Sequence, residues 1–91
     1  MPLQVDVVNV DRKLWSGEAV SLFARTADGD IGILPGHTPL LAILAEGEVR
    51  VKPASGAQVV ANVGGGFISV EHDRVTVVSD TATLVSGSSP S

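Results

Sequence analysis

The two histidines are the first side chains to consider for chemistry, because an imidazole can bind a metal or transfer a proton near neutral pH. His37 follows a Pro-Gly pair and His72 stands between two acidic residues, and neither belongs to an HxH or HxxxH pattern. A metal site needs several converging ligands, and the chain has no cysteine to supply thiolates. We predict no metal site, a loop or interface role for His37, and a solvated turn position for His72.

Paired carboxylates are the next candidates for catalysis. They occur at Asp28 and Asp30 and again at Glu46 and Glu48, each pair on either side of a glycine. Catalytic carboxylate pairs depend on burial or an apolar pocket to separate their pKa values, whereas turn residues are exposed to water. Because GxSxG is also absent, we predict no catalytic residue and do not expect an enzyme.

A glycine triplet at residues 64–66 could be mistaken for a phosphate-binding loop. Such a loop needs the pattern GxxxxGK[ST] before a helix, but here Phe67 opens a segment of strand-like residues. The triplet instead favours a β-bulge or a place where two backbones approach closely. We therefore predict no cofactor.

Composition narrows the class of partner. The formal net charge is −4, and the six Lys and Arg residues are scattered along the chain, so no basic surface for nucleic acid is expected. The longest apolar run, residues 40–45, is far shorter than the roughly 18–20 residues that span a bilayer, and the first residues do not resemble a signal peptide. Any membrane association must therefore go through another protein.

The elements that would position these side chains are short strands. Apolar residues alternate with polar ones, turn signals recur every eight to twelve residues, and no long window has the period of a helix, so we predict an all-β sandwich or barrel. Residues 16–17, 28–30, 46–48, 53–56 and 71–73 are predicted turns. Residues 35–39, between Pro35 and Pro39, are predicted to form a loop, and residues 40–44 fit either a strand or a helical turn. The predicted strands cover residues 3–10, 18–26, 31–34, 49–52, 58–63, 67–70 and 74–79.

Three segments resemble one known family in order and spacing. Residues 29–41, GDIGILPGHTPLL, are similar to the G-[ED]-[ILM]-G-[IV]-[LY]-P-[GN]-H-x-P-[LF] signature of the epsilon subunit of rotary ATP synthases (the delta subunit in mitochondria). Residues 8–17, with an aromatic before Ser-Gly, resemble the family's opening segment, and residues 64–82 resemble its closing one. The resemblance covers residues 3–82, which is nearly the whole chain.

The resemblance implies a fold and a function. The fold would be a ten-stranded β-sandwich of two five-stranded sheets over residues 1–84. The Ser, Gly and Pro content of residues 85–91 predicts a disordered tail after it. The function would be that of a non-catalytic rotor subunit in the central stalk, which binds the gamma subunit and the polar loops of the c-ring to couple ion translocation to ATP synthesis. Such a subunit would lie peripherally at the cytoplasmic face of a bacterial plasma membrane, with an organellar inner or thylakoid membrane as the second choice.

The resemblance also implies a set of interface residues. The turn Gly29, Asp30 and Ile31 would face the c-ring loops, where Asp30 would contact a cation. His37 and its loop would lie near gamma. The residues themselves add Phe67, because the glycine triplet and the apolar side chain after it suit a face that another backbone approaches.

One part of the family pattern is not expected in this sequence. Most family members continue with a two-helix hairpin, whereas nothing helical is expected after Ala82. We therefore do not expect inhibition of ATP hydrolysis or ATP sensing through such helices, whether the chain is naturally short or part of a longer one.

Two other functions stay open. The first alternative function is a β-sandwich binding module, which predicts a concave apolar pocket. The second is an enzyme.

Overall fold

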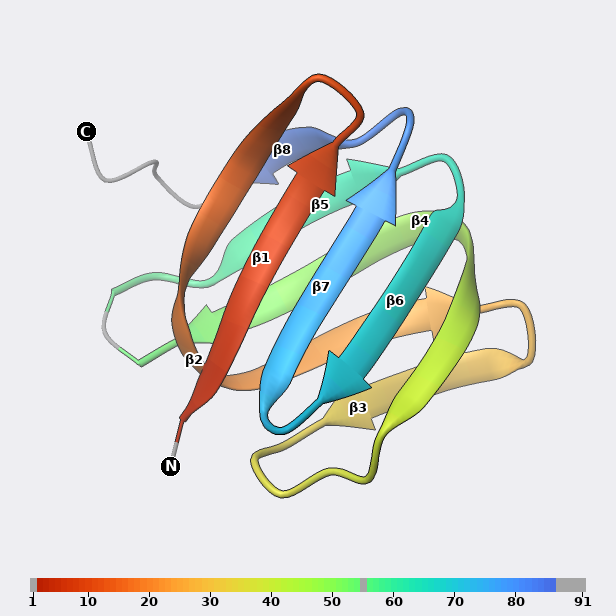
Figure 1. Ribbon diagram of the computed structural model, residues 1–91. Helices are drawn as coiled ribbons and strands as arrows, with labels where there is room; N and C mark the ends of the chain where they lie inside the picture. The colour runs from red at the N-terminus through yellow and green to blue at the C-terminus, as the bar shows by residue number, and fades with distance from the viewer. Residues whose placement is uncertain (1, 55, 87–91) are drawn as a thin grey trace.

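The computed structural model describes residues 2–54 and 56–86, which form eight β-strands (Figure 1). The all-β class is confirmed, since every regular element of the described residues is a strand. The described part of the chain contains no helix with the length and apolar character needed to cross a membrane. The strands are β1 (Leu3–Asn9), β2 (Arg12–Thr26), β3 (Gly29–Ile33), β4 (Leu40–Pro53), β5 (Val59–Val63), β6 (Gly66–Glu71), β7 (Arg74–Ser79) and β8 (Thr83–Ser86).

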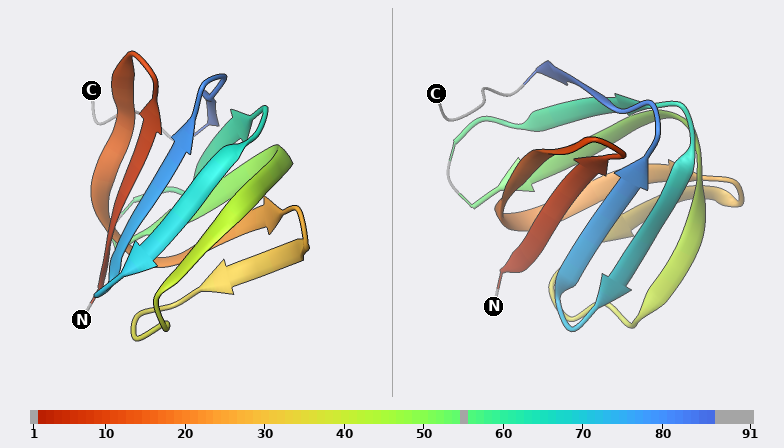
Figure 2. Two further views of the ribbon diagram at one scale, coloured as in Figure 1. Left: turned by 45° about the vertical axis from the view of Figure 1, so that its right-hand side comes forward. Right: turned by 45° about the horizontal axis from the view of Figure 1, so that its top comes forward.

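The strands form two layers that face each other (Figures 1 and 2). The hydrogen-bonded order is β3-β2-β1-β7-β6-β4-β5-β8, and a further pairing of β2 with β4 closes the middle of this order into a ring. Layer A consists of β1, β7, β6 and the first halves of β2 and β4. Layer B consists of β3, β5, β8 and the second halves of β2 and β4. The pairing of β1 with β7 is parallel, and all the other pairings are antiparallel.

The prediction of ten strands in two separate five-stranded sheets is not confirmed, because eight strands form one continuous order over the described residues. The difference lies in β2 and β4, which are 15 and 14 residues long. β2 pairs with β1 and then with β3, and β4 pairs with β6 and then with β5. Each long strand thus passes from layer A to layer B, and the two layers are joined through them.

Two predicted turns lie inside these long strands, so those predictions are wrong. Ser16 and Gly17 are paired with β1, and Gly47 is paired with Val63 on β5. Gly47 has φ +153°, a backbone conformation that favours glycine, at the place where β4 leaves layer A. A glycine that looks like a chain reversal in the sequence here allows a strand to bend.

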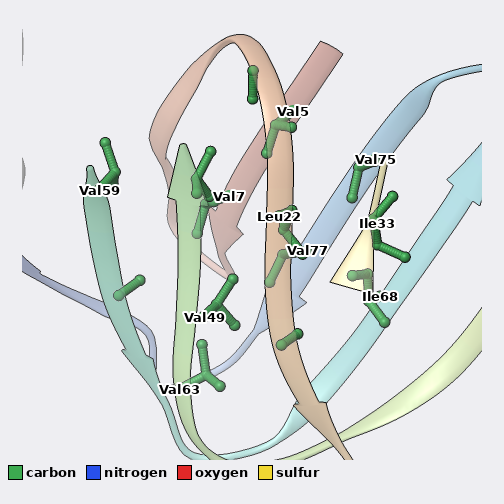
Figure 3. Packing of buried hydrophobic residues seen from close by; sticks show 14 of the residues in the cluster. Val5, Val7, Leu22, Ile33, Val49, Val59, Val63, Ile68, Val75 and Val77 are labelled. Carbon is green, nitrogen blue, oxygen red and sulfur yellow. The ribbon is translucent and has the colours of Figure 1, made fainter. Parts of the chain in front are cut away.

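The core lies between the layers and is almost entirely aliphatic (Figure 3). Alternate residues of β1, β6 and β7 point inward, as the period of two predicts. The largest fully buried side chains are Leu3, Leu22, Ile33, Ile68, Val5, Val7, Val49, Val51, Val59, Val70, Val75 and Val77. Residues far apart in the sequence meet in this core, so the two layers are held together as one unit.

The glycine triplet and the last strand complete the fold. Gly66 has φ +121°, and a Cβ at this position would collide with the backbone of Val78, so the predicted close backbone approach is confirmed there. β8 was not predicted. It pairs with β5 and includes Val85 and Ser86, the first two residues of the predicted tail. Residues 87–91 of that tail lie outside the described residues.

Candidate interface surfaces

The β2–β3 turn carries three of the predicted interface residues. Thr26 closes the turn, because its hydroxyl donates to the Gly29 carbonyl at 2.7 Å and accepts from the Asp28 amide at 3.2 Å. Gly29 has φ +129°, which suits glycine at the start of β3. Gly29 and Asp30 are exposed, whereas Ile31 packs against the core. Gly29 and Asp30 are therefore available to a partner, and Ile31 anchors the turn.

Asp30 already has a partner within the chain. Its Oδ1 lies 3.3 Å from Nε of Arg25, the residue opposite it on β2, and both side chains are more than half exposed. An exposed ion pair of this kind contributes only about 0–1 kcal/mol to stability. A second cation could therefore share the carboxylate at little cost to the fold.

His37 lies in the loop of residues 34–39, which joins β3 to β4. The His37 amide donates to the Leu34 carbonyl at 3.1 Å, and the Gly36 amide donates to Oδ1 of Asp73 at 2.7 Å. The His37 ring is half-buried, with Nδ1 2.7 Å from the Thr38 carbonyl. Because a carbonyl only accepts, Nδ1 carries a proton, and Nε2 is an acceptor when the ring is neutral.

Phe67 belongs to a row of apolar side chains that crosses layer A on its outer face. Ile43 on β4 is paired with Phe67 on β6, Phe67 with Val78 on β7, and Val78 with Val8 on β1. We call these four residues the apolar row. Ile43 and Phe67 are exposed, and Val78 and Val8 are half-buried. Four strands at about 4.8 Å spacing make the row roughly 14 Å long.

Polar residues border the apolar row on one side. The parallel row contains Ser69 on β6, Thr76 on β7 and Asp6 on β1. The Asp6 carboxylate accepts from the Ser16 hydroxyl at 2.6 Å and lies 3.6 Å from Lys13 Nζ and 3.7 Å from Arg74 Nη1. An apolar centre with a polar rim is the usual anatomy of a protein interface.

The first half of β4 connects the three predicted interface regions. The His37 loop leads directly into Leu40, and at the other end the Ile43 carbonyl accepts from the Ala27 amide of the β2–β3 turn at 2.9 Å (Figure 1). Between these ends, Leu41 and Ile43 are 71% and 64% exposed. Sequence reasoning missed both residues. The available signal was the apolar run at residues 40–45. A strand formed by this run would be apolar on both faces.

Layer B carries a different surface, an open groove lined in part by Phe23, Leu34, Arg50 and Lys52. Arg50 Nη2 is paired with Oε1 of Glu48 at 2.9 Å. The groove is open to solvent, and both apolar and cationic side chains line it. Among residues 2–54 and 56–86, no group of three or more His, Asp or Glu residues could hold a metal ion.

Comparison with known proteins identifies one family. Residues 2–85 match the family described as the beta-sandwich domain of the ATP synthase delta/epsilon chain. The chain is 51% identical over 82 residues to the ATP synthase epsilon chain of Micrococcus luteus, covering 90% of both chains. It is 51% identical over 85 residues to the epsilon chain of Frankia casuarinae, covering 92% of this chain and 99% of that one.

A solved structure shares the fold at lower identity. It is a chain of the Euglena gracilis mitochondrial ATP synthase, from the structure of OSCP, F1 and c-ring in rotational state 1. The TM-score is 0.84 at 24% identity, and the match covers 91% of this chain. The chain spans about half of its Euglena counterpart, 53% of that length.

Proposed function

Because the chain belongs to the delta/epsilon chain family of ATP synthases, we propose that it is a rotor subunit of the central stalk. In this role it binds the gamma subunit and the polar loops of the c-ring and turns with them, so that ion translocation is coupled to ATP synthesis. The epsilon chain is a non-catalytic subunit of ATP synthase. The proposed location is peripheral, at the cytoplasmic face of a bacterial plasma membrane, as expected from relatives in Micrococcus luteus and Frankia casuarinae.

The observation that carries this proposal is the apolar row together with Leu41. Three large side chains, Leu41, Ile43 and Phe67, are 71%, 64% and 41% exposed on adjacent strands. Contiguous apolar surface on a soluble domain marks a place where another molecule binds. Its residues are held on paired strands of a two-layer sandwich, so little conformational freedom is lost on binding. We assign gamma to this surface.

The β2–β3 turn supports the proposed contact with the c-ring. Gly29 and Asp30 are exposed at its tip, and Gly29 has no side chain to keep a second loop away. The Asp30 carboxylate can meet a cation of the ring while it keeps its pairing with Arg25. The turn and the apolar row meet at Ile43, so gamma and the ring could contact the domain side by side.

Two phenylalanines provide a matched test variant and control variant for gamma binding. Phe67 and Phe23 have the same side chain and the same exposure of 41%, but Phe67 lies on layer A and Phe23 lies on layer B. The experiment compares the affinity of purified gamma for the wild-type chain and for the variants Phe67→Ser and Phe23→Ser. We expect Phe67→Ser to weaken binding at least tenfold, as for a truncated aromatic hot spot, and Phe23→Ser to leave it within about twofold.

Two results would contradict the proposed binding of gamma. Wild-type protein that binds no gamma at micromolar concentrations would remove the rotor function. An equal loss of affinity for Phe67→Ser and Phe23→Ser would remove the assignment of gamma to layer A. Circular dichroism of both variants controls for their folding.

A further inference from the structure

Asp73 contacts two other parts of the chain from a turn of only two residues. Its Oδ1 accepts a hydrogen bond from the Gly36 amide at 2.7 Å, and its backbone carbonyl accepts one from the Gln4 amide at 2.8 Å. Gly36 is 37 positions away in the sequence and belongs to the loop that carries His37. The β6–β7 turn and the His37 loop lie beside each other at the same end of the molecule (Figure 1).

The backbone of this turn is unusual for the residues it contains. Glu71 and Arg74 are paired, so His72 and Asp73 form a two-residue hairpin turn, with φ of +52° and +61°. Positive φ at both positions is characteristic of the type I′ turn, which favours Asn-Gly or Asp-Gly. Glycine at position 73 would relieve the backbone but would remove the carboxylate that holds Gly36. The chain instead accepts a side chain in a disfavoured conformation at this position.

The His37 loop has few other backbone contacts to hold it. Its proline residues have no amide to donate, and Gly36 has φ +88° with open space where a Cβ would stand. The internal hydrogen bond from His37 to Leu34 shapes the loop but does not attach it to the sandwich. The contact between Gly36 and Asp73 does attach it, and the acceptor is charged, which makes the bond stronger than a neutral one.

We propose that Asp73 is a positioning residue for the partner-binding surface: its carboxylate holds the His37 loop in the conformation that a partner recognises. A loop that is already ordered loses less conformational entropy when it binds. Asp73 acts through Gly36 and need not touch the partner. The part of this inference that concerns a partner rests on the proposed function, whereas the part that concerns the loop does not.

Three substitutions separate the hydrogen bond from the backbone strain. Asp73→Gly suits positive φ and removes the acceptor. Asp73→Asn also suits positive φ and keeps an oxygen acceptor in the same place. His72→Gly relieves strain in the same turn without changing the contact to Gly36. The readouts are hydrogen exchange of the Gly36 amide in the isolated chain and the affinity of each variant for gamma.

We expect exchange at Gly36 to become about tenfold faster in Asp73→Gly, because a hydrogen bond to a carboxylate is lost. In Asp73→Asn and His72→Gly the rate should stay within about threefold of wild type, since the bond is kept. Affinity for gamma should follow the same order, with a several-fold loss confined to Asp73→Gly. Should Asp73→Gly fail to fold, Asp73→Ser takes its place, because a serine hydroxyl is shorter and does not reach Gly36.

Each contrary result has a distinct meaning. Unchanged exchange in Asp73→Gly would overturn the claim that Asp73 holds the loop, and so would faster exchange in His72→Gly of the same size. Faster exchange with unchanged affinity for gamma would overturn the positioning role. If wild-type protein binds no gamma, the rotor function fails, while the exchange result still decides whether Asp73 holds the loop.

Discussion

Ile43 on β4 and Phe67 on β6 are direct register partners whose side chains lie on the outer face of layer A, 64% and 41% exposed. Directly opposed residues of an antiparallel pair have Cβ atoms about 4.5–5.5 Å apart, so the two side chains form one apolar surface. Neither side chain is needed to fill the core, which is built from the opposite face of the same strands. Their exposure is best explained by a partner that covers them.

A lysine in the apolar row should weaken the proposed binding of gamma without unfolding the domain. In Ile43→Lys we expect the free energy of unfolding to change by less than about 0.5 kcal/mol, because the site is exposed. Affinity for gamma should fall by at least tenfold, because a charge would have to be buried without a partner. Val85→Lys is the matched control, since Val85 is 55% exposed on β8 of layer B. Isothermal titration with gamma is the measurement, and equal affinities for the two variants would contradict the assignment.

A charge reversal at Asp30 tests the proposed contact with the c-ring. Asp30→Lys places a second cation beside Arg25 and replaces an exposed ion pair, so we expect stability to fall by about 1 kcal/mol or less. In the assembled enzyme, the number of ions pumped per ATP hydrolysed should decrease in Asp30→Lys. Binding of the wild-type chain to the ring should weaken as salt increases, because salt screens the contact of Asp30 with a cation. Asp28→Lys is the control, because Asp28 is exposed in the same turn. Pumping that is unchanged in Asp30→Lys would exclude Asp30 from the interface.

Gly65 and Gly66 offer a paired test of the close backbone approach. Both have positive φ, +122° and +121°, but a Cβ would meet open space at Gly65 and the backbone of Val78 and Ser79 at Gly66. We expect Gly65→Ala to cost about 1–3 kcal/mol from backbone strain alone. Gly66→Ala should cost at least 3 kcal/mol by the same estimate, because the clash adds to the strain. Urea unfolding followed by fluorescence of Trp15, the single tryptophan, gives both values. Equal losses would show that the strands are free to separate.

Truncation of the core tests whether the two layers form one cooperative unit. Ile68 is fully buried on β6. Ile68→Val should cost about 0.5–1.5 kcal/mol and Ile68→Ala about 2–5 kcal/mol, because a larger cavity is left. In a domain of this size, each kcal/mol lowers Tm by roughly 4–8 °C. Calorimetry should show a single transition for both variants, and two separate transitions would mean that the layers unfold independently.

Several elements could be predicted because their signal is local. The alternation in residues 74–79 and 67–70 predicts β7 and β6, and the Asp-Gly step predicts the β2–β3 turn. Continuous β2 and β4 could not be predicted, since Gly17 and Gly47 are kept in strands by pairing with Val5 and Val63. Val5 and Val63 are distant from these glycines in the sequence. The local residue pattern therefore does not reveal the hydrogen bonds that override the turn preference.

The candidate interface also contains residues that could be predicted from the sequence and residues that could not. Gly29, Asp30, Ile31 and His37 were named from a resemblance to a family and Phe67 from its place after the glycine triplet, and the structure shows where each lies. Leu41 and Ile43 were missed, because only the pairing with β6 shows that these two members of an apolar run point outward. The link between Asp73 and Gly36 was also out of reach, since it joins two turns 37 positions apart.

By itself, the sequence determined the all-β class, most of the short strands and the Asp-Gly turn between β2 and β3, since each depends on a residue and its near neighbours. Only the tertiary structure decided that two strands serve both layers, that an apolar row crosses four strands and that the Asp73 carboxylate accepts a hydrogen bond from a distant loop. Pairing between strands selects neighbours across the sheet, and those neighbours determine which apolar side chains are buried and which remain exposed.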